Sequence, residues 1–190
     1  MQKKLRVVLF LSIFLLLSYI NSSEVEIAGS KNAYAIAVAF NGEKFFATPS
    51  HTLLGAEVPR IKYDGNYYAI SEYHLSALRD FALLKIHDTS LFEALTIIPL
   101  QLAGDNENFY FEFPLNQTQL INFKELKGQS GRLIKIDNTI GLFQGYLINK
   151  SENSHIYRAV TLKIFPNELR KVDFSTIKAE FLQKNLKNTN

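Results

Sequence analysis

Short runs of β-forming residues, separated by turn residues, follow one another through most of this 190-residue chain. Ala33 to Phe40 and Glu43 to Ala47 flank Asn41-Gly42, and an Asn-Gly pair between two such runs predicts a β-hairpin. Further runs of the same kind lie at 58–62, 67–70, 81–86, 109–113, 132–136, 140–148 and 157–165. Many short strands with close turns are typical of β-barrels and β-sandwiches, so we predict an all-β protein.

The last part of the chain has a different pattern. After Pro166, apolar residues recur on a rough stripe at helical spacing, namely Leu169, Val172, Phe174, Ile177 and Phe181. A stripe of this kind is typical of an amphipathic helix that packs one face against a core. We therefore predict that a C-terminal helix follows the strands.

The most loop-like stretch lies in the middle of the chain, at 101–108, and it divides the β-rich part into two lobes. We assign the first lobe to 24–115 and the second, with the helix, to 116–190. The first lobe carries six basic and twelve acidic side chains, and the second carries twelve basic and six acidic ones. Opposite charges would attract across an interface, although chance clustering of solvated side chains also explains the split.

A targeting segment precedes the two lobes at 1–23. Lys3, Lys4 and Arg6 form a basic region, and fourteen mostly apolar residues follow at 7–20. That length suits a signal peptide better than a bilayer-spanning helix, which needs about 20 residues. The alternative is an uncleaved N-terminal anchor. In either case we expect an exported protein, periplasmic or secreted, with no other membrane association.

The net charge of the chain offers no support for a nucleic-acid partner. The formal charge is +3, and the three basic residues of the targeting segment account for all of it, so that 24–190 is formally neutral. The sequence also has no RNA-binding motif and no phosphate-binding loop. We therefore expect no nucleic acid among the partners of this protein.

The chain has no Cys, which excludes disulfides, thiolate metal sites and a cysteine nucleophile. Three of the four histidines, His74, His87 and His155, lack the spacing of zinc ligands. We therefore predict no metal site and no cofactor.

Three short segments present a His, an Asp and a Ser in that order. His51 follows a β-run and a turn, and Asp80 directly precedes an apolar run, while Ser130 lies between Gly128 and Gly131. A serine hydroxyl needs a base to act as nucleophile, and a buried carboxylate holds an imidazole base in the required tautomer. Glycines let backbone N–H groups converge, so the amides of Gly128 and Ser130 would form an oxyanion hole. We predict that His51, Asp80 and Ser130 are catalytic.

At these segments the chain resembles the trypsin-like (chymotrypsin-fold) serine endopeptidases, in particular the bacterial Cys-free branch with HtrA-like and glutamyl-endopeptidase-like enzymes. Residues 48–56, TPSHTLLGA, resemble the family's histidine segment, and 80–85, DFALLK, match its aspartate segment at every position. Residues 128–131, GQSG, keep the G-x-S-G of its serine segment. The resemblance spans about 31–170. It implies two packed antiparallel β-barrels and cleavage of protein or peptide substrates through an acyl-enzyme intermediate.

The resemblance also locates a substrate pocket, for which it implies Lys124, Gln144 and Tyr146. Lys124 stands six residues before the serine, where the Arg- or Lys-specific members of the family carry Asp. A basic residue there would favour an acidic side chain on the substrate, next to the cleaved bond.

The chain departs from the family pattern in the second lobe. Gln129 stands where Asp or Asn is usual, Leu133 stands where Pro is usual, and Ser130 follows Asp80 by only 50 positions. These departures favour the main alternative, a catalytically inactive exported protein that uses the same fold for binding. A third reading is a small-ester hydrolase on the same triad. Its α/β-hydrolase form is disfavoured, because that fold orders its triad Ser, Asp, His.

Overall fold

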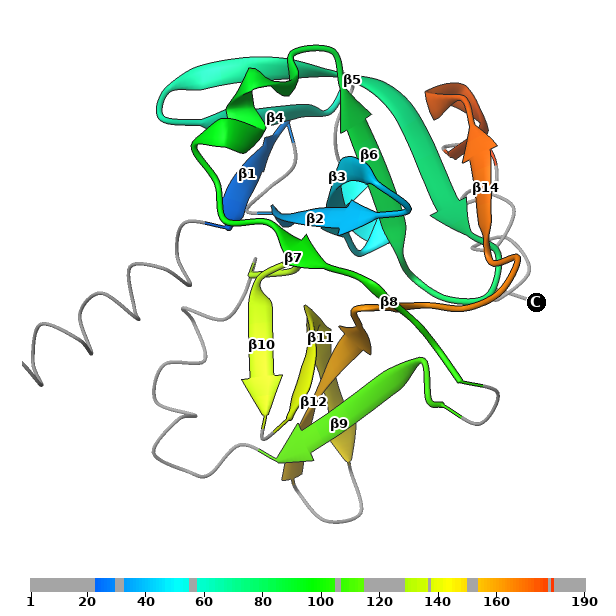
Figure 1. Ribbon diagram of the computed structural model, residues 1–190. Helices are drawn as coiled ribbons and strands as arrows, with labels where there is room; N and C mark the ends of the chain where they lie inside the picture. Colours follow the sequence, from blue (N-terminus) through cyan, green and yellow to red (C-terminus); the bar gives the residue numbers. More distant parts are fainter. Residues whose placement is uncertain are drawn as a thin grey trace, which may run out of the picture.

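The computed structural model describes residues 23–29, 33–54, 58–104, 107–114, 129–136, 138–149, 154–177 and 179. The strands are β1 (Glu24–Ala28), β2 (Tyr34–Phe40), β3 (Glu43–Thr48), β4 (Arg60–Tyr63), β5 (Asn66–Ser76), β6 (Ala82–Ile86), β7 (Ile98–Pro99), β8 (Gln101–Leu102), β9 (Tyr110–Pro114), β10 (Leu133–Ile136), β11 (Thr139–Asn149), β12 (Ser154–Thr161), β13 (Lys163–Ile164) and β14 (Leu169–Val172) (Figure 1). Two 3-10 helices, η1 (Ser50–Leu53) and η2 (Thr89–Glu93), join them, and residues 174–177 are helical. The described protein is therefore mostly β with one short helix, as the all-β prediction requires. The predicted targeting segment lies outside the described residues except for its last one.

The first half of the chain forms a closed barrel of six antiparallel strands in the order β1-β4-β5-β6-β3-β2. Pairing of β1 with β2 closes the barrel, with Val25 opposite Ala35. The predicted hairpin at Asn41-Gly42 is confirmed, since Phe40 pairs with Glu43 and both turn residues have positive φ, 49° and 80°. That backbone geometry suits the twist of the flanking strands, and Asn and Gly adopt it most readily.

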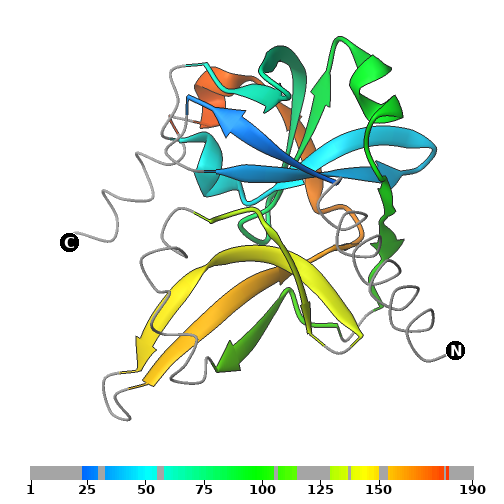
Figure 2. The ribbon, with the colours of Figure 1, turned by 90° about the vertical axis from the view of Figure 1, so that its left-hand side faces the viewer.

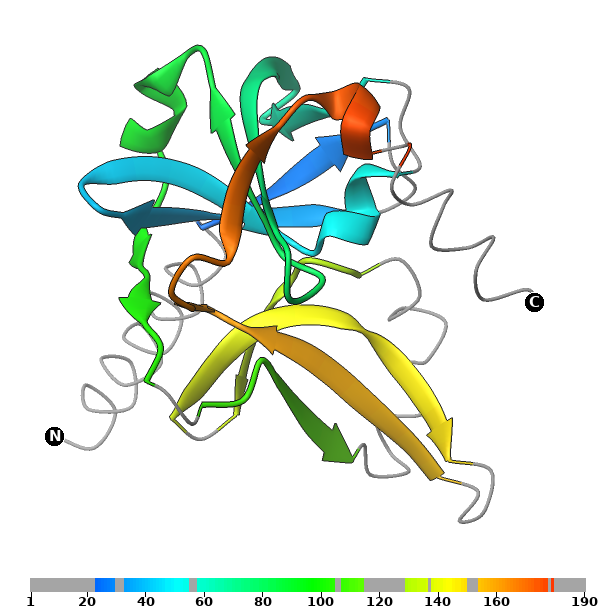
Figure 3. The same cartoon turned by 90° about the vertical axis from the view of Figure 1, so that its right-hand side faces the viewer.

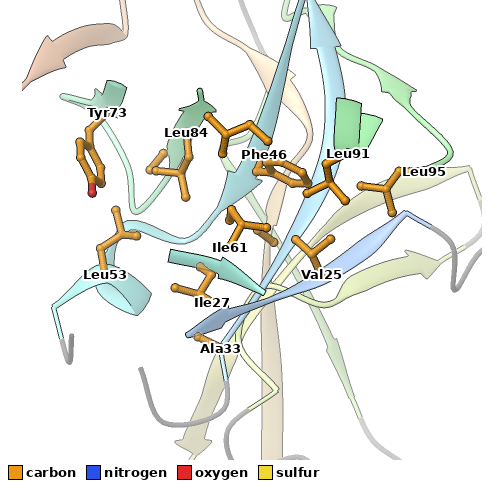
Figure 4. Packing of buried hydrophobic residues seen from close by; sticks show 14 of the residues in the cluster. Val25, Ile27, Ala33, Phe46, Leu53, Ile61, Tyr73, Leu84, Leu91 and Leu95 are labelled. Atoms are coloured by element: carbon orange, nitrogen blue, oxygen red, sulfur yellow. The ribbon is translucent and has the colours of Figure 1, made fainter. Parts of the chain in front are cut away.

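Three central strands of the barrel bury both of their faces. Alternate residues of β2, β3 and β6 face the barrel interior, where Ala37, Phe46 and Leu84 belong to one apolar cluster (Figure 4). The residues between them, among them Val38 and Leu83, belong to a second cluster outside the barrel. Because side chains alternate along a strand, a run that is apolar at every position, such as 35–38, serves two cores at once.

The second half of the chain contributes a four-stranded antiparallel sheet in the order β10-β11-β12-β9. In Figure 2 this sheet lies below the barrel, with β11 and β12 as one long curved hairpin. Leu142 of β11 and Val160 of β12 are fully buried and complete the second cluster against the barrel's outer face. The two halves of the molecule therefore share the second apolar cluster. The other described strands of the second half pair elsewhere, β13 with β8 and β14 with β5, and a second closed barrel is not seen among the described residues.

The chain returns to the first barrel at its end. Leu169–Val172, predicted as part of a helix, is instead strand β14, which pairs antiparallel with β5 (Figure 3). On that side of β5, strand β4 pairs only with residues 66–69, and β14 pairs with residues 73–76. An unpaired strand edge offers backbone donors and acceptors to any nearby segment, which outweighs the helical pattern of the sequence. The predicted C-terminal helix survives as the helical residues 174–177.

Within the described residues, no helix combines the length and the apolar character that a membrane crossing requires.

Candidate active site

His51 is presented by the short 3-10 helix η1, which follows directly on strand β3. Two hydrogen bonds to Pro49 fix the start of this helix: the Thr52 hydroxyl donates to the Pro49 carbonyl at 2.7 Å and the Thr52 N–H donates to the same oxygen at 3.1 Å. Leu53 is fully buried in the barrel core and anchors the other end. The helix is thus fixed at both ends by contacts with the barrel, while the His51 side chain remains 38% exposed.

Asp80 lies in the turn between β5 and β6 and points at His51. Its Oδ2 accepts from His51 Nδ1 at 2.6 Å, and its Oδ1 accepts from the His51 backbone N–H at 2.9 Å. The Ser50 hydroxyl donates to Oδ1 at 2.7 Å, and Gln144 Nε2 donates to Oδ2 at 2.6 Å. The carboxylate therefore has four donors around two oxygens, and its side chain is only 22% exposed.

These contacts determine the charge state of Asp80. Burial by itself raises the pKa of the carboxyl, but the hydrogen bond and charge of His51, with the hydrogen bonds from Gln144 and Ser50, outweigh it. The pKa of Asp80 is therefore held well below its usual range. An ionised carboxylate on Nδ1 keeps the proton of a neutral imidazole there, so Nε2 is left as the acceptor that a general base needs.

Ser130 lies at the junction of the barrel and the second sheet. Its carbonyl accepts from Tyr34 N–H at 2.8 Å, and an isolated parallel bridge joins it to Ala33. The neighbouring Gly131 has φ of +92°, and a Cβ there would lie 1.8 Å from the Tyr34 carbonyl oxygen. The glycine that follows the serine in the predicted motif is therefore required by this close approach of two backbones.

The Ser130 hydroxyl is not hydrogen-bonded to His51 in the part of the chain that the structure describes. Its Oγ donates instead to the backbone carbonyl of Gln144 at 3.3 Å. The structure thus joins His51 to Asp80 directly, and it joins Ser130 to Asp80 through Gln144.

Gln144 was predicted to line the substrate pocket, and the structure gives it a different contact. It sits at a β-bulge in β11, between Phe143 and Gly145, where the register against β12 shifts. A bulge turns a side chain away from the regular alternation, and here the Gln144 amide reaches Asp80. Tyr146 pairs through its backbone with Tyr157 in the same hairpin. Lys124 and Gly128, the other predicted pocket and oxyanion-hole residues, lie outside the described residues.

Sequence reasoning missed two further groups at Asp80. Ser50 donates its hydroxyl to the carboxylate, and the Tyr110 hydroxyl accepts from the Asp80 N–H at 3.1 Å. The position of Ser50 beside His51 is a sequence signal for the first, because a short hydroxyl there can reach the histidine's partner. Tyr110 comes from β9 of the other sheet, and nothing in the sequence pairs it with Asp80.

A cavity of about 540 Å³ opens beside the His51–Asp80 pair. Its lining combines Leu54 and Leu75 of the barrel with Arg170 and Ile177 of the C-terminal return. The cavity is therefore built partly from the segment that packs back on β5. Among the described residues, no group of three or more His, Asp or Glu side chains is placed to hold a metal ion.

A scan against protein-family models found no match for this chain, and searches among curated proteins and solved structures also found none. The closed barrel is compatible with a trypsin-like fold.

Proposed function

We propose that this protein is an exported serine endopeptidase of the trypsin-like kind, with His51, Asp80 and Ser130 as its triad. The observation that carries the proposal is the His51–Asp80 pair, in which Nδ1 lies 2.6 Å from a carboxylate held by three further donors. An oriented imidazole whose Nε2 has no hydrogen bond among the described residues is the arrangement that general-base catalysis needs.

The architecture adds support to this proposal. His51 and Asp80 come from the closed barrel, and Ser130 comes from the segment that enters the second sheet, so the site lies where the two halves meet. We propose that the second lobe, 116–190, is the second β-barrel of such a fold. The amides of Gly128 and Ser130 then form the oxyanion hole.

The proposed reaction is acyl transfer with water as the final acceptor. Ser130 Oγ attacks the carbonyl carbon of a peptide bond while its proton passes to His51 Nε2. The imidazolium then returns that proton to the leaving amine as the carbon–nitrogen bond breaks. Water, deprotonated by His51, hydrolyses the ester and releases Ser130. Asp80 stays ionised throughout and stabilises the imidazolium, which its lowered pKa favours.

Covalent labelling with a fluorophosphonate probe tests the proposal. The mature chain should be labelled at Ser130, and Ser130→Ala and His51→Ala should abolish both labelling and cleavage of casein. Matched controls are Ser90→Ala and His87→Ala, which alter exposed residues outside the site and should keep the parent rate. If Ser130→Ala cleaves casein as fast as the parent, the proposal is wrong.

One observation favours the alternative of a non-catalytic binding protein. The Ser130 hydroxyl donates to the Gln144 carbonyl rather than to His51, so the nucleophile and the base are not paired in this state. An enzyme requires the hydroxyl to turn toward His51 when substrate binds, whereas a binding protein does not. Absence of labelling at every pH from about 6 to 9 would favour the binding protein.

A further inference from the structure

A buried ion pair involves the residue next to Asp80 in the chain. The guanidinium of Arg79 and the carboxylate of Glu168 are both fully buried, and they make two parallel hydrogen bonds, Nε to Oε2 at 2.9 Å and Nη2 to Oε1 at 2.8 Å. Such a fork-to-fork pairing fixes both the distance and the plane of the two groups. These residues are 89 positions apart in the sequence.

Every remaining polar group of the pair is also satisfied. Arg79 Nη1 donates to the Thr161 carbonyl at 2.6 Å and to the Thr161 hydroxyl at 3.1 Å, and Nη2 also donates to the Lys163 carbonyl. Glu168 also accepts from the Ser76 hydroxyl at 2.8 Å and from the Phe165 N–H at 3.0 Å. A buried charge this completely partnered is held in one position, because any movement leaves a donor or acceptor unpaired.

The pair joins three parts of the fold at one point. Arg79 belongs to the β5–β6 turn of the barrel, Thr161 ends strand β12 of the second sheet, and Glu168 begins the return toward β14. The guanidinium also lies 4.3 Å from the ring centroid of Phe81 and 5.1 Å from that of Phe165. The Arg79 side chain therefore fixes the barrel's turn against the second half of the molecule.

The same turn carries Asp80. The Ser76 hydroxyl, itself bonded to Glu168, accepts from the Arg79 N–H at 3.1 Å, and the Phe81 N–H donates to the Arg79 carbonyl at 2.9 Å. Asp80 therefore lies between Arg79 and Phe81, and both of these neighbours are held in place by the ion pair. His51 stands on the barrel, whereas Gln144 and Ser130 stand on the other half, so the position of Asp80 relative to both depends on this anchor.

We propose that Arg79 and Glu168 are positioning residues of the active site: their buried pair holds Asp80 in register with His51 and Gln144 across the two halves of the molecule. This inference rests on the proposed function of that site. The C-terminal return is then part of the catalytic apparatus, because it supplies Glu168.

The decisive variant is the double substitution Arg79→Met with Glu168→Leu. Removing one partner alone strands a buried charge and unfolds the turn, whereas replacing both with apolar side chains of similar volume generally preserves a fold. The double variant therefore separates two roles. If the pair only stabilises the fold, replacing it leaves the His51–Asp80 contact unchanged. If the pair also holds Asp80 in position, replacing it disturbs that contact.

Three measurements on the double variant test the proposal. Urea unfolding reports the fold, the rate of fluorophosphonate labelling reports Ser130, and proton NMR of the His51 Nδ1–H reports the bond to Asp80 without requiring catalysis. We expect the double variant to unfold cooperatively at a lower midpoint than the parent, because the Thr161 and Lys163 carbonyls and the Phe165 N–H lose their side-chain partners. We expect at least a tenfold lower labelling rate and loss of the downfield Nδ1–H signal, because the carboxylate moves away from His51.

The matched control is Lys62→Met with Glu26→Leu, which removes an exposed pair between β4 and β1 with the same change of charges. It should keep the parent signal and labelling rate. A folded Arg79–Glu168 double variant with the parent Nδ1–H signal and a labelling rate within twofold overturns the inference. If the double variant does not fold, Arg79→Lys, which keeps the charge and loses the fork, decides in the same way. A parent that is never labelled refutes the proposed function, and the Nδ1–H signal still tests the positioning.

Discussion

Gln144 Nε2 lies 2.6 Å from Asp80 Oδ2, the same distance that separates His51 Nδ1 from that oxygen. The two donors come from different halves of the molecule and share one acceptor. The backbone carbonyl of Gln144 at the same time accepts from the Ser130 hydroxyl. Gln144 therefore links Ser130 to Asp80, because its backbone carbonyl accepts from the serine hydroxyl and its side-chain amide donates to the carboxylate.

We predict that Gln144→Leu lowers kcat/KM about tenfold to a hundredfold. The variant removes a hydrogen bond to a charged group, which is worth about 1.5–3 kcal/mol, and leaves the bulge backbone in place. Initial rates with a peptide substrate measure the effect, and Gln101→Leu, an exposed residue of β8, is the control. Unchanged kcat/KM in Gln144→Leu would show that this contact has no part in orienting Asp80.

Asp80 should make stability depend on pH in the acid range. Its pKa is lowered in the folded protein, so its contribution is fully present above the unfolded pKa of about 3.9 and is lost as pH falls toward the folded pKa. We expect the parent to lose its stability advantage over Asp80→Asn as pH decreases from about 5 to 2. Urea unfolding at a series of pH values tests this, with Asp64→Asn in an exposed turn as the control. If the stability difference between the parent and Asp80→Asn is constant over this pH range, the pKa of Asp80 is not lowered by folding.

Gly131→Ala should be strongly destabilising, by about 3 kcal/mol or more. The new Cβ meets the Tyr34 carbonyl oxygen at 1.8 Å, and the residue must also keep a positive φ. Gly42→Ala separates the two effects, because Gly42 has φ of +80° and no atom within 4 Å of the added Cβ. It should cost only about 1 kcal/mol. Equal losses in the two variants, measured by urea unfolding, would mean that the close approach at Ser130 is absent.

Ile177→Ala should lower the free energy of unfolding by about 2–5 kcal/mol, as expected for a buried aliphatic side chain. Ile177 is 3% exposed and belongs to the barrel's inner cluster, although it lies in the C-terminal return. Ser175→Ala on the exposed side of the same segment is the control and should change stability by less than about 0.5 kcal/mol. A loss as small as the control's would mean that the return does not pack into the barrel.

Most of the strands and the His51–Asp80 partnership could be predicted because they depend on local information, whereas β1, β7 and β8 were not predicted. Alternating and continuous apolar runs specify strands, Asn41-Gly42 specifies its hairpin, and the segments around His51 and Asp80 carry their motif within a few residues. The pattern at Leu169–Val172 was misread because it suits a helix, and only the open edge of β5 made it a strand.

The remaining features of the site depend on contacts between residues far apart in the chain, which no local pattern encodes. Gln144 reaches Asp80 because a bulge in β11 turns its side chain, and Tyr110 accepts from Asp80 because β9 crosses below the barrel. The fork between Arg79 and Glu168 spans 89 residues, and it forms only where folding also brings the further hydrogen-bond partners that offset the cost of removing both charges from water. The sequence by itself determined most of the strand-forming segments and the order of the chemical groups, because both follow from side-chain pattern. Only the tertiary structure decided which groups surround the carboxylate, since hydrogen bonds between distant residues form when packing brings those residues together.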